Sequence, residues 1–184
     1  MKKLENCLEK TILMAIDPGA TGAIALFDAR DGTVKVHKMP DTPKDILSLI
    51  ARYSVLTKKG YIENVGQYMP GDSATAATTF AKHVGHLEMA LIACRIPFDR
   101  VAPRTWQKII RSKPKRPDVR NCKDPKRKKR KLAAYKRKFK NHIKSQMQEL
   151  YPRIKVTLAT ADALAILTYV ITKEHGLSLK DLRG

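Results

Sequence analysis

The segment "ILMAIDPGATGAIALF", from Ile12 to Phe27, constrains the fold more than any other part of the chain. Two apolar runs flank a short turn that contains glycine and proline, and each run is typical of a buried central strand. Strands joined this closely are expected to be neighbours in one antiparallel sheet. The first run ends on Asp17, so the hairpin places a carboxylate at the end of an otherwise hydrophobic strand.

The rest of the chain alternates strand and helix patterns. "DARDG" has the residues of a tight turn, and "TVKVHK" alternates like a half-exposed strand, which predicts a three-stranded antiparallel unit. Further patterns predict a helix at 41–56, a strand "YIENV" at 61–65, a helix at 73–94, a strand at 96–102, a short helix at 103–110 and a last helix at 159–176 that Gly176 ends. This order predicts an α/β fold with a five-stranded mixed sheet and helices on both faces.

Composition narrows the class of partner. The 184 residues, 43% of them apolar, suffice for one domain with a real core, and the net charge of +20 favours a polyanionic partner. Nucleic acid is the commonest such partner, and an anionic membrane surface is the alternative. No run approaches the roughly 18 apolar residues of a membrane-spanning helix. Three widely spaced cysteines predict no disulfide framework, so we expect a soluble, cytoplasmic protein.

The positive charge is concentrated in one block. Residues Lys113 to Lys140 hold fifteen Lys or Arg against Asp118 and Asp124, and so supply +13 of the +20. The front of the block, up to Lys131, is rich in proline and poor in apolar residues, which predicts a loop that is disordered or ordered by a ligand. From Lys131 onward, apolar residues recur at spacings of three and four and predict a helix with a basic face. We expect this block to contact phosphates, with a solvated surface or a localisation signal as the alternative.

Three carboxylates stand in apolar surroundings. Asp17 ends the first strand, Glu63 lies in or at the end of the fourth, and Asp162 lies in the first turn of the last helix. A buried charge is costly without a partner, and oxygen ligands from separate elements suit Mg²⁺ or Mn²⁺. In a basic chain such a site suggests metal-assisted phosphodiester hydrolysis. Alternatively, Asp17 could open a turn before Pro18, Asp162 could serve the positive end of its helix and Glu63 could pair with a core lysine.

Five segments carry a family resemblance. "AIDPGATGAIAL", "YIENV", "VAPRTWQK", "IKSQMQEL" and "ATADALAI" occur in the order found in RuvC-type Holliday-junction resolvases, which include bacteriophage and organellar relatives. The chain resembles this family from Thr11 to His175. The resemblance implies an RNase H-like fold, a homodimer, and Mg²⁺-dependent cleavage of two opposed strands of a four-way DNA junction. Mn²⁺ is expected to substitute for Mg²⁺.

The resemblance also implies roles for single residues. Asp17, Glu63 and Asp162 would be the metal-binding catalytic residues, and Lys144 would lie near the scissile phosphate. The whole chain, 1–184, would be one RNase H-like domain with a basic insertion at about 112–140. Family members place an apolar or aromatic side chain after the glutamate as a wedge in the junction, a place that Tyr68 or Met69 could fill. The expected DNA-binding residues are Tyr68, Lys108, Lys126, Arg127, Lys128, Lys129, Arg130 and Lys131.

One feature departs from the family pattern. The family usually carries a fourth metal ligand one turn before the last aspartate, whereas this chain has only Leu158, Ala159, Thr160 and Ala161 there. Either three carboxylates suffice with additional water, or a side chain from elsewhere completes the set. His142 and Glu88 are the two candidates.

Other chemically notable residues have plainer explanations. His83 and His86 lie three apart on the predicted long helix, but no third ligand accompanies them, so we expect surface or dimer-interface residues rather than a metal pair. Trp106 begins a short helix and is expected in the core rather than stacked on a base.

Two other classes of function compete with a nuclease. "DPGATG" also resembles the phosphate-binding hairpin of the actin and sugar-kinase ATPases, but those proteins need two duplicated domains, and this chain has the length and the single hairpin of one. The second alternative is a non-catalytic, structure-selective nucleic-acid-binding protein with a decayed nuclease site. The missing fourth ligand keeps that alternative open.

Overall fold

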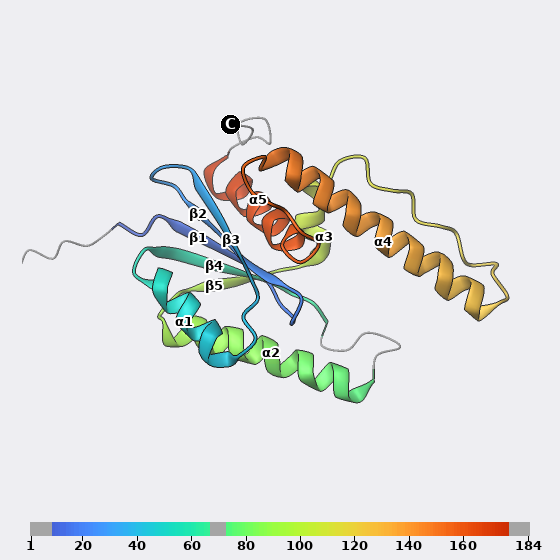
Figure 1. Cartoon of the computed structure of the whole chain (residues 1–184), viewed down its shortest axis with the longest axis horizontal. Helices are drawn as coiled ribbons and strands as arrows, with labels where there is room; N and C mark the ends of the chain where they lie inside the picture. Colours follow the sequence, from blue (N-terminus) through green and yellow to red (C-terminus); the bar gives the residue numbers. More distant parts are fainter. Residues whose placement is uncertain (1–8, 67–72, 177–184) are drawn as a thin grey trace, which may run out of the picture.

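The computed structural model describes residues 9–66 and 73–176 and contains a five-stranded sheet in the order β3-β2-β1-β4-β5 (Figure 1). Strands β1 to β3 form an antiparallel unit, and β4 and β5 run parallel to β1, so the sheet is mixed as predicted. The strands are β1 (Ile12–Asp17), β2 (Ala23–Asp28), β3 (Thr33–Lys38), β4 (Thr57–Glu63) and β5 (Phe98–Val101).

Helices cover both faces of the sheet, as predicted. α1 (Pro43–Ser54) and α2 (Ala74–Ala93) lie on one face. The other face carries α3 (Pro103–Trp106), the 3₁₀ turn η1 (Gln107–Ile109), α4 (Pro125–Leu150) and α5 (Ala161–His175) (Figure 1). No helix in the described part of the chain is long and apolar enough to cross a membrane.

Alternation along the strands divides the core into two clusters. In β1, Leu13 and Ala15 face α5, whereas Met14 and Ile16 face α1 and α2. This is the period of two expected when a central strand is covered on both faces. The apolar run that begins the hairpin is therefore continuous because both of its faces are buried.

The turn between β1 and β2 depends on its glycines. Gly19 has a φ of +114°, a conformation that favours glycine, and the Gly22 amide donates to the Gly19 carbonyl at 2.9 Å. A side chain at Gly22 would clash with the carbonyl oxygen of Asp17. The turn therefore folds closely back over the end of β1 and fixes the backbone at Asp17.

The basic helix begins earlier than the sequence indicated. α4 starts at Pro125, where the Asp124 side chain caps the helix by accepting from the Lys126 amide at 2.8 Å. The prediction that the helix starts at Lys131 was wrong, because lysine and arginine are good helix formers and the Asp-Pro pair supplies a start signal. Residues 126–131 are therefore helical and not part of the loop.

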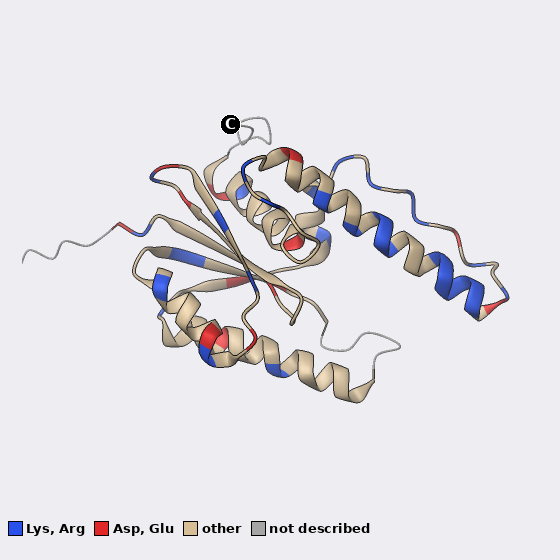
Figure 2. Cartoon of the chain, viewed as in Figure 1, with Lys and Arg blue, Asp and Glu red and all other residues tan. Residues whose placement is uncertain are grey.

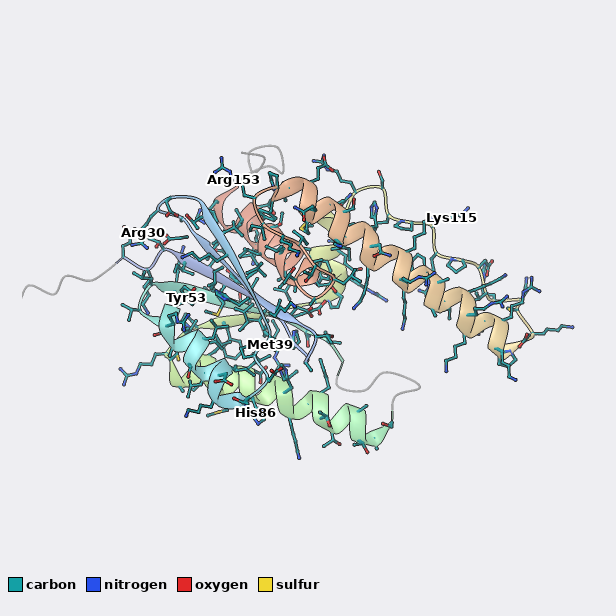
Figure 3. The ribbon with its side chains drawn as sticks, in the orientation of Figure 1. Arg30, Met39, Tyr53, His86, Lys115 and Arg153 are labelled. Atoms are coloured by element: carbon teal, nitrogen blue, oxygen red, sulfur yellow. The ribbon has the colours of Figure 1, made fainter. Side chains whose placement is uncertain are left out.

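The coil before α4 is tied to the body of the protein at its first residue. The Arg111 amide donates to Gln146 Oε1 at 3.2 Å, and Gln146 Nε2 donates to the Arg111 carbonyl at 2.8 Å. From there the coil runs to the far end of α4, so helix and coil extend together away from the sheet, with Lys115 on the coil (Figures 1 and 3). Residues 113–124 therefore form a loop, as predicted, and its disorder without a ligand stays a prediction.

β4 also begins earlier than its pattern suggested, at Thr57 rather than Tyr61. Lys58 and Lys59 interrupt the apolar pattern at the entry to the strand, which explains why only its buried end was recognised. The end of the strand matters more for function, because Glu63 is its last residue.

Candidate active site

Two of the three carboxylates lie at the ends of neighbouring parallel strands. Asp17 is the last residue of β1 and Glu63 the last of β4, and the residues just before them, Ile16 and Ile62, are paired in register. Side chains alternate along a strand, so Asp17 and Glu63 point to the face opposite Ile16 and Ile62. That face is the one covered by α5.

The third carboxylate comes from the helix on this face. Asp162 is the second residue of α5, whose packing against β1 and β2 holds its first turn near the strand ends. The positive end of the helix dipole favours a negative charge at this position. The structure thus brings together Asp17, Glu63 and Asp162, which are 46 and 99 positions apart in the sequence.

The three acids are electrostatically coupled. Burial, together with the negative charges of Asp162 and Glu63, raises the pKa of Asp17 to about 8. The Asp17 and Glu63 side chains also share a hydrogen bond. Burial likewise raises the pKa of Glu63 and of Asp162 above their ordinary values. The cluster therefore favours a bound positive charge, supplied either by a proton or by a cation.

The donor chemistry of this cluster fits a hard divalent cation. Carboxylate oxygens from three separate elements are the ligands that Mg²⁺ and Mn²⁺ accept. However, across residues 9–66 and 73–176 no three or more His, Cys, Asp or Glu side chains are already arranged to hold a metal ion. The donors are therefore neighbours, and their side chains would have to adjust around an ion.

Lys140 is a further candidate site residue that the sequence did not single out. Its positive charge lowers the pKa of Asp17, Glu63 and Asp162 alike, so it lies on the acidic side of α4. In the sequence it was counted only as part of the basic block. Lys140 is exposed, and no local pattern in the sequence separates it from the other lysines of the block.

Lys144 lies one helical turn after Lys140 and is half-buried. Among the described residues, no hydrogen bond or ion pair joins it to the three carboxylates. Lys108 is exposed in η1. The two lysines named from the family resemblance are thus on the same side of the sheet as the acids but not in direct contact with them.

Trp106 is in the core, as predicted, with 2% of its surface exposed. Its indole Nε1–H donates to Glu63 Oε1 at 2.8 Å, a contact that the sequence did not reveal. The partner of Glu63 is therefore the neutral indole of Trp106, and not the core lysine that was considered as an alternative.

The two candidates for a fourth ligand have other partners. His142 Nε2 lies 2.6 Å from the Arg111 carbonyl oxygen, and Glu88 forms an ion pair with Arg100. Ala159 lies in the turn before α5, which begins at Ala161, so its side chain does not share a helical face with Asp162. None of these positions supplies a further oxygen or nitrogen ligand in this arrangement.

His83 has a structural role beneath the hairpin turn. Its Nδ1 accepts from the Gly19 amide at 3.2 Å, so the proton of the neutral ring resides on Nε2. Burial lowers the pKa of His83, which keeps the ring neutral. The contact joins α2 to the turn that follows Asp17.

Apart from Lys108 in η1, six of the predicted DNA-binding residues lie on α4. Residues 126–131 are exposed on the first turns of α4, where lysine and arginine gather at the end of the helix farthest from the sheet (Figure 2). Tyr68 and Met69, the predicted wedge residues, lie outside the described residues. The basic surface is thus carried mainly by one helix that extends beyond the sheet.

Comparison with a solved structure supports the fold. Neither the family models nor the curated proteins give a match to the sequence. The chain is similar to the structure of Thermus thermophilus RuvC, at 14% identity and a TM-score of 0.51, over 90% of this chain and 96% of that one. T. thermophilus RuvC in complex with a Holliday junction substrate gives the same identity and coverage with a TM-score of 0.47. With its five-stranded mixed sheet and helices on both faces, the chain has an RNase H-like α/β fold.

Proposed function

We propose that this protein is a metal-dependent endonuclease that resolves four-way or otherwise branched DNA by paired phosphodiester hydrolysis. The observation that carries the proposal is the convergence of Asp17, Glu63 and Asp162 with Lys140 on one face of the sheet. A fold by itself hosts many functions, so the argument depends on this site rather than on the likeness of the fold.

Asp17, Glu63 and Asp162 would hold the proposed Mg²⁺, or Mn²⁺ in its place. Such ions, when bound, activate water as a nucleophile and stabilise the leaving oxygen of a phosphodiester. The chain's own residues prepare the site: the shared proton of Asp17 and Glu63 must leave, and the positive charge of Lys140 favours its loss. Lys140 and Lys144 would then attract and orient the scissile phosphate, for which their place on one face of α4 is suitable.

The basic helix would supply most of the DNA affinity. Residues 126–131 are exposed lysines and arginines, which bind phosphates largely without regard to sequence. The branched substrate is inferred from the motifs shared with the RuvC-type resolvases. The described residues of a chain contain one such acidic cluster, so cutting two opposed strands requires two copies, and we propose a homodimer.

Three finer assignments complete the proposal. The chain would act in the cytoplasm, it would form one resolvase domain over residues 1–184, and it would belong to the phage- or organellar-like branch of the resolvases. The extended α4 and its coil support the last of these, because the basic block looks like an insertion beside the bacterial form.

One alternative has an observation in its favour. No ready-made group of three metal-ligating side chains is present in the described ranges, which is what a decayed site in a non-catalytic junction-binding protein would give. The two functions make different predictions for cleavage, while both predict binding.

A nuclease assay separates them. A four-way junction, a nicked duplex and a linear duplex would each be incubated with the protein in Mg²⁺ or in EDTA. We expect paired cuts in the junction with Mg²⁺, none with EDTA, and little cleavage of linear duplex. Tight junction binding without cleavage in either Mg²⁺ or Mn²⁺ would favour the non-catalytic alternative, whereas absence of junction binding would contradict both.

A further inference from the structure

A buried hydrogen bond ties the only tryptophan of the chain to the candidate active site. The Trp106 indole Nε1–H donates to Glu63 Oε1 at 2.8 Å, and the ring is 2% exposed. A hydrogen bond to a carboxylate inside a protein is stronger than one between neutral groups in water. The bond therefore holds one Glu63 oxygen firmly.

The backbone places the indole beside Glu63. Glu63 pairs in register with Val101, the last residue of β5, and the Asn64 amide donates to the Val101 carbonyl at 2.8 Å. α3 starts two residues after Val101, with the Thr105 amide bonded to the Ala102 carbonyl at 2.8 Å. Trp106 thus follows β5, the strand paired with β4 at Glu63, and lies on the face that also carries α5.

An indole suits this position because its N–H group acts only as a hydrogen-bond donor. Its N–H has no charge, accepts no hydrogen bond and does not ionise. A lysine or arginine in its place would also orient Glu63, but would neutralise the charge that a cation needs. Trp106 therefore fixes Glu63 Oε1 without cancelling the negative charge of the cluster.

We propose that Trp106 is a positioning residue that orients the Glu63 carboxylate for a divalent cation. This inference rests on the proposed function, because it requires that Glu63 binds metal. Partners that orient a metal ligand through a hydrogen bond commonly change metal affinity by about 10- to 100-fold. Loss of the indole N–H should therefore weaken metal binding in the absence of any DNA.

The first test removes only the donor. Trp106→Phe keeps an aromatic ring in the core but cannot donate to Glu63, and we expect its Mn²⁺ dissociation constant, measured by calorimetry without DNA, to rise about tenfold. Tyr151→Phe is the matched control. It deletes a buried hydrogen bond of equal length, 2.8 Å to Thr168 Oγ1, in the same core cluster. The control should lose stability but keep its Mn²⁺ affinity.

The second test takes its main signal from the wild-type protein and uses a variant only as a control. Because the chain has one tryptophan, an amide ¹H–¹⁵N spectrum of the wild-type protein contains one indole N–H resonance. Adding Mg²⁺ should shift this resonance with the affinity found by calorimetry, and the shift should vanish in Glu63→Gln. An unmoved resonance while Mg²⁺ binds, or equal Mn²⁺ affinities of Trp106→Phe and wild type, would overturn the inference.

The experiments distinguish failure of the positioning role from failure of the proposed function. If the wild-type protein cleaves junctions and binds Mn²⁺ while Trp106→Phe does both equally well, the positioning role alone fails. If the wild-type protein neither binds Mn²⁺ nor cleaves junctions, the proposed function fails and the positioning role fails with it.

Discussion

Asp17 has a strongly raised pKa, which links the stability of the metal-free protein to pH. Its pKa is raised to about 8 in the folded state by burial and by neighbouring negative charges, against about 4 in an unfolded chain. Between these values the folded state binds a proton that the unfolded state has lost. By linkage, the free energy of unfolding must fall as pH rises through this window.

We therefore predict that, in EDTA, the free energy of unfolding falls between about pH 4 and about pH 8 and levels off above that. Asp17→Asn, which removes the ionisable group, should flatten this dependence and raise stability near pH 8. Denaturant unfolding at a series of pH values measures both effects. Added Mg²⁺ should stabilise wild type most at high pH, because the cation replaces the proton.

Asp28 offers a control of opposite sign. Hydrogen bonds from the exposed Arg30 and from Thr11 hold the pKa of Asp28 below its usual range. Its contribution to stability is therefore present above about pH 4 and lost as pH falls below it. If Asp17→Asn and Asp28→Asn changed the pH profile in the same direction, the buried cluster would not be the source of the predicted slope.

Lys140 and Lys144 can be distinguished by the same measurement. Only Lys140 has a charge that lowers the pKa of the three acids, so Lys140→Ala should make the metal-free protein still less stable near neutral pH relative to acid pH. Lys144→Ala should leave that profile unchanged. Both variants should slow junction cleavage if both lysines face the scissile phosphate. Equal pH profiles for the two variants would contradict the claim that Lys140 interacts with the acidic cluster.

At the scale of elements, α4 is the part of the chain with the clearest separate function. Its first turns are exposed and basic, and they lie at the positive end of the helix dipole, where further positive charge is unfavourable without an anionic partner. Each phosphate that the helix neutralises contributes about 0.9 to the slope of log affinity against log salt.

We predict that the triple variant Lys126→Gln, Arg127→Gln and Lys131→Gln flattens this slope by about 3, for a junction and for a linear duplex alike. Glutamine keeps helix propensity, so the change is one of charge. A matched triple outside α4, at the exposed Lys44, Arg52 and Lys58, should leave the slope unchanged. Equal effects of the two triples would show that net charge alone, rather than α4, sets the affinity.

The elements differ in how far the sequence predicts them. β1, β2 and α5 have continuous apolar patterns and were predicted within a residue or two of their observed ends. The start of α4 was misplaced because its helical signal is capping and propensity, with no apolar periodicity before Leu132. Propensity is a weak guide without periodicity, so the basic run was taken for a loop.

The site was predicted only where the sequence marks it locally. Asp17, Glu63 and Asp162 stand out as single charges in apolar runs, so they could be found and grouped. Trp106 and Lys140 could not be assigned, because their roles come from β5 leading into α3 and from the angle of α4 over the sheet. Such contacts depend on tertiary geometry that no local pattern encodes.

At the scale of the whole molecule, the basic surface and the acidic cluster are distinct regions that lie next to each other. The acids lie at the ends of β1 and β4 under α5, and the positive charge gathers along α4 and its coil (Figure 2). A DNA backbone bound at the far end of α4 would pass along the helix toward Lys140, Lys144 and the acids. The arrangement separates binding from chemistry, so substitutions should affect one without the other.

The most direct test of the central claim measures both cleavage and binding of a four-way junction on the same preparations. The variants are Asp17→Asn, Glu63→Gln and Asp162→Asn. Each variant should lose cleavage in Mg²⁺ and in Mn²⁺ while its junction affinity stays near that of wild type, because the three acids are assigned to metal and α4 to DNA. Near-normal cleavage by any of the three would contradict the assignment of that residue. Near-normal cleavage by all three would contradict the proposed active site.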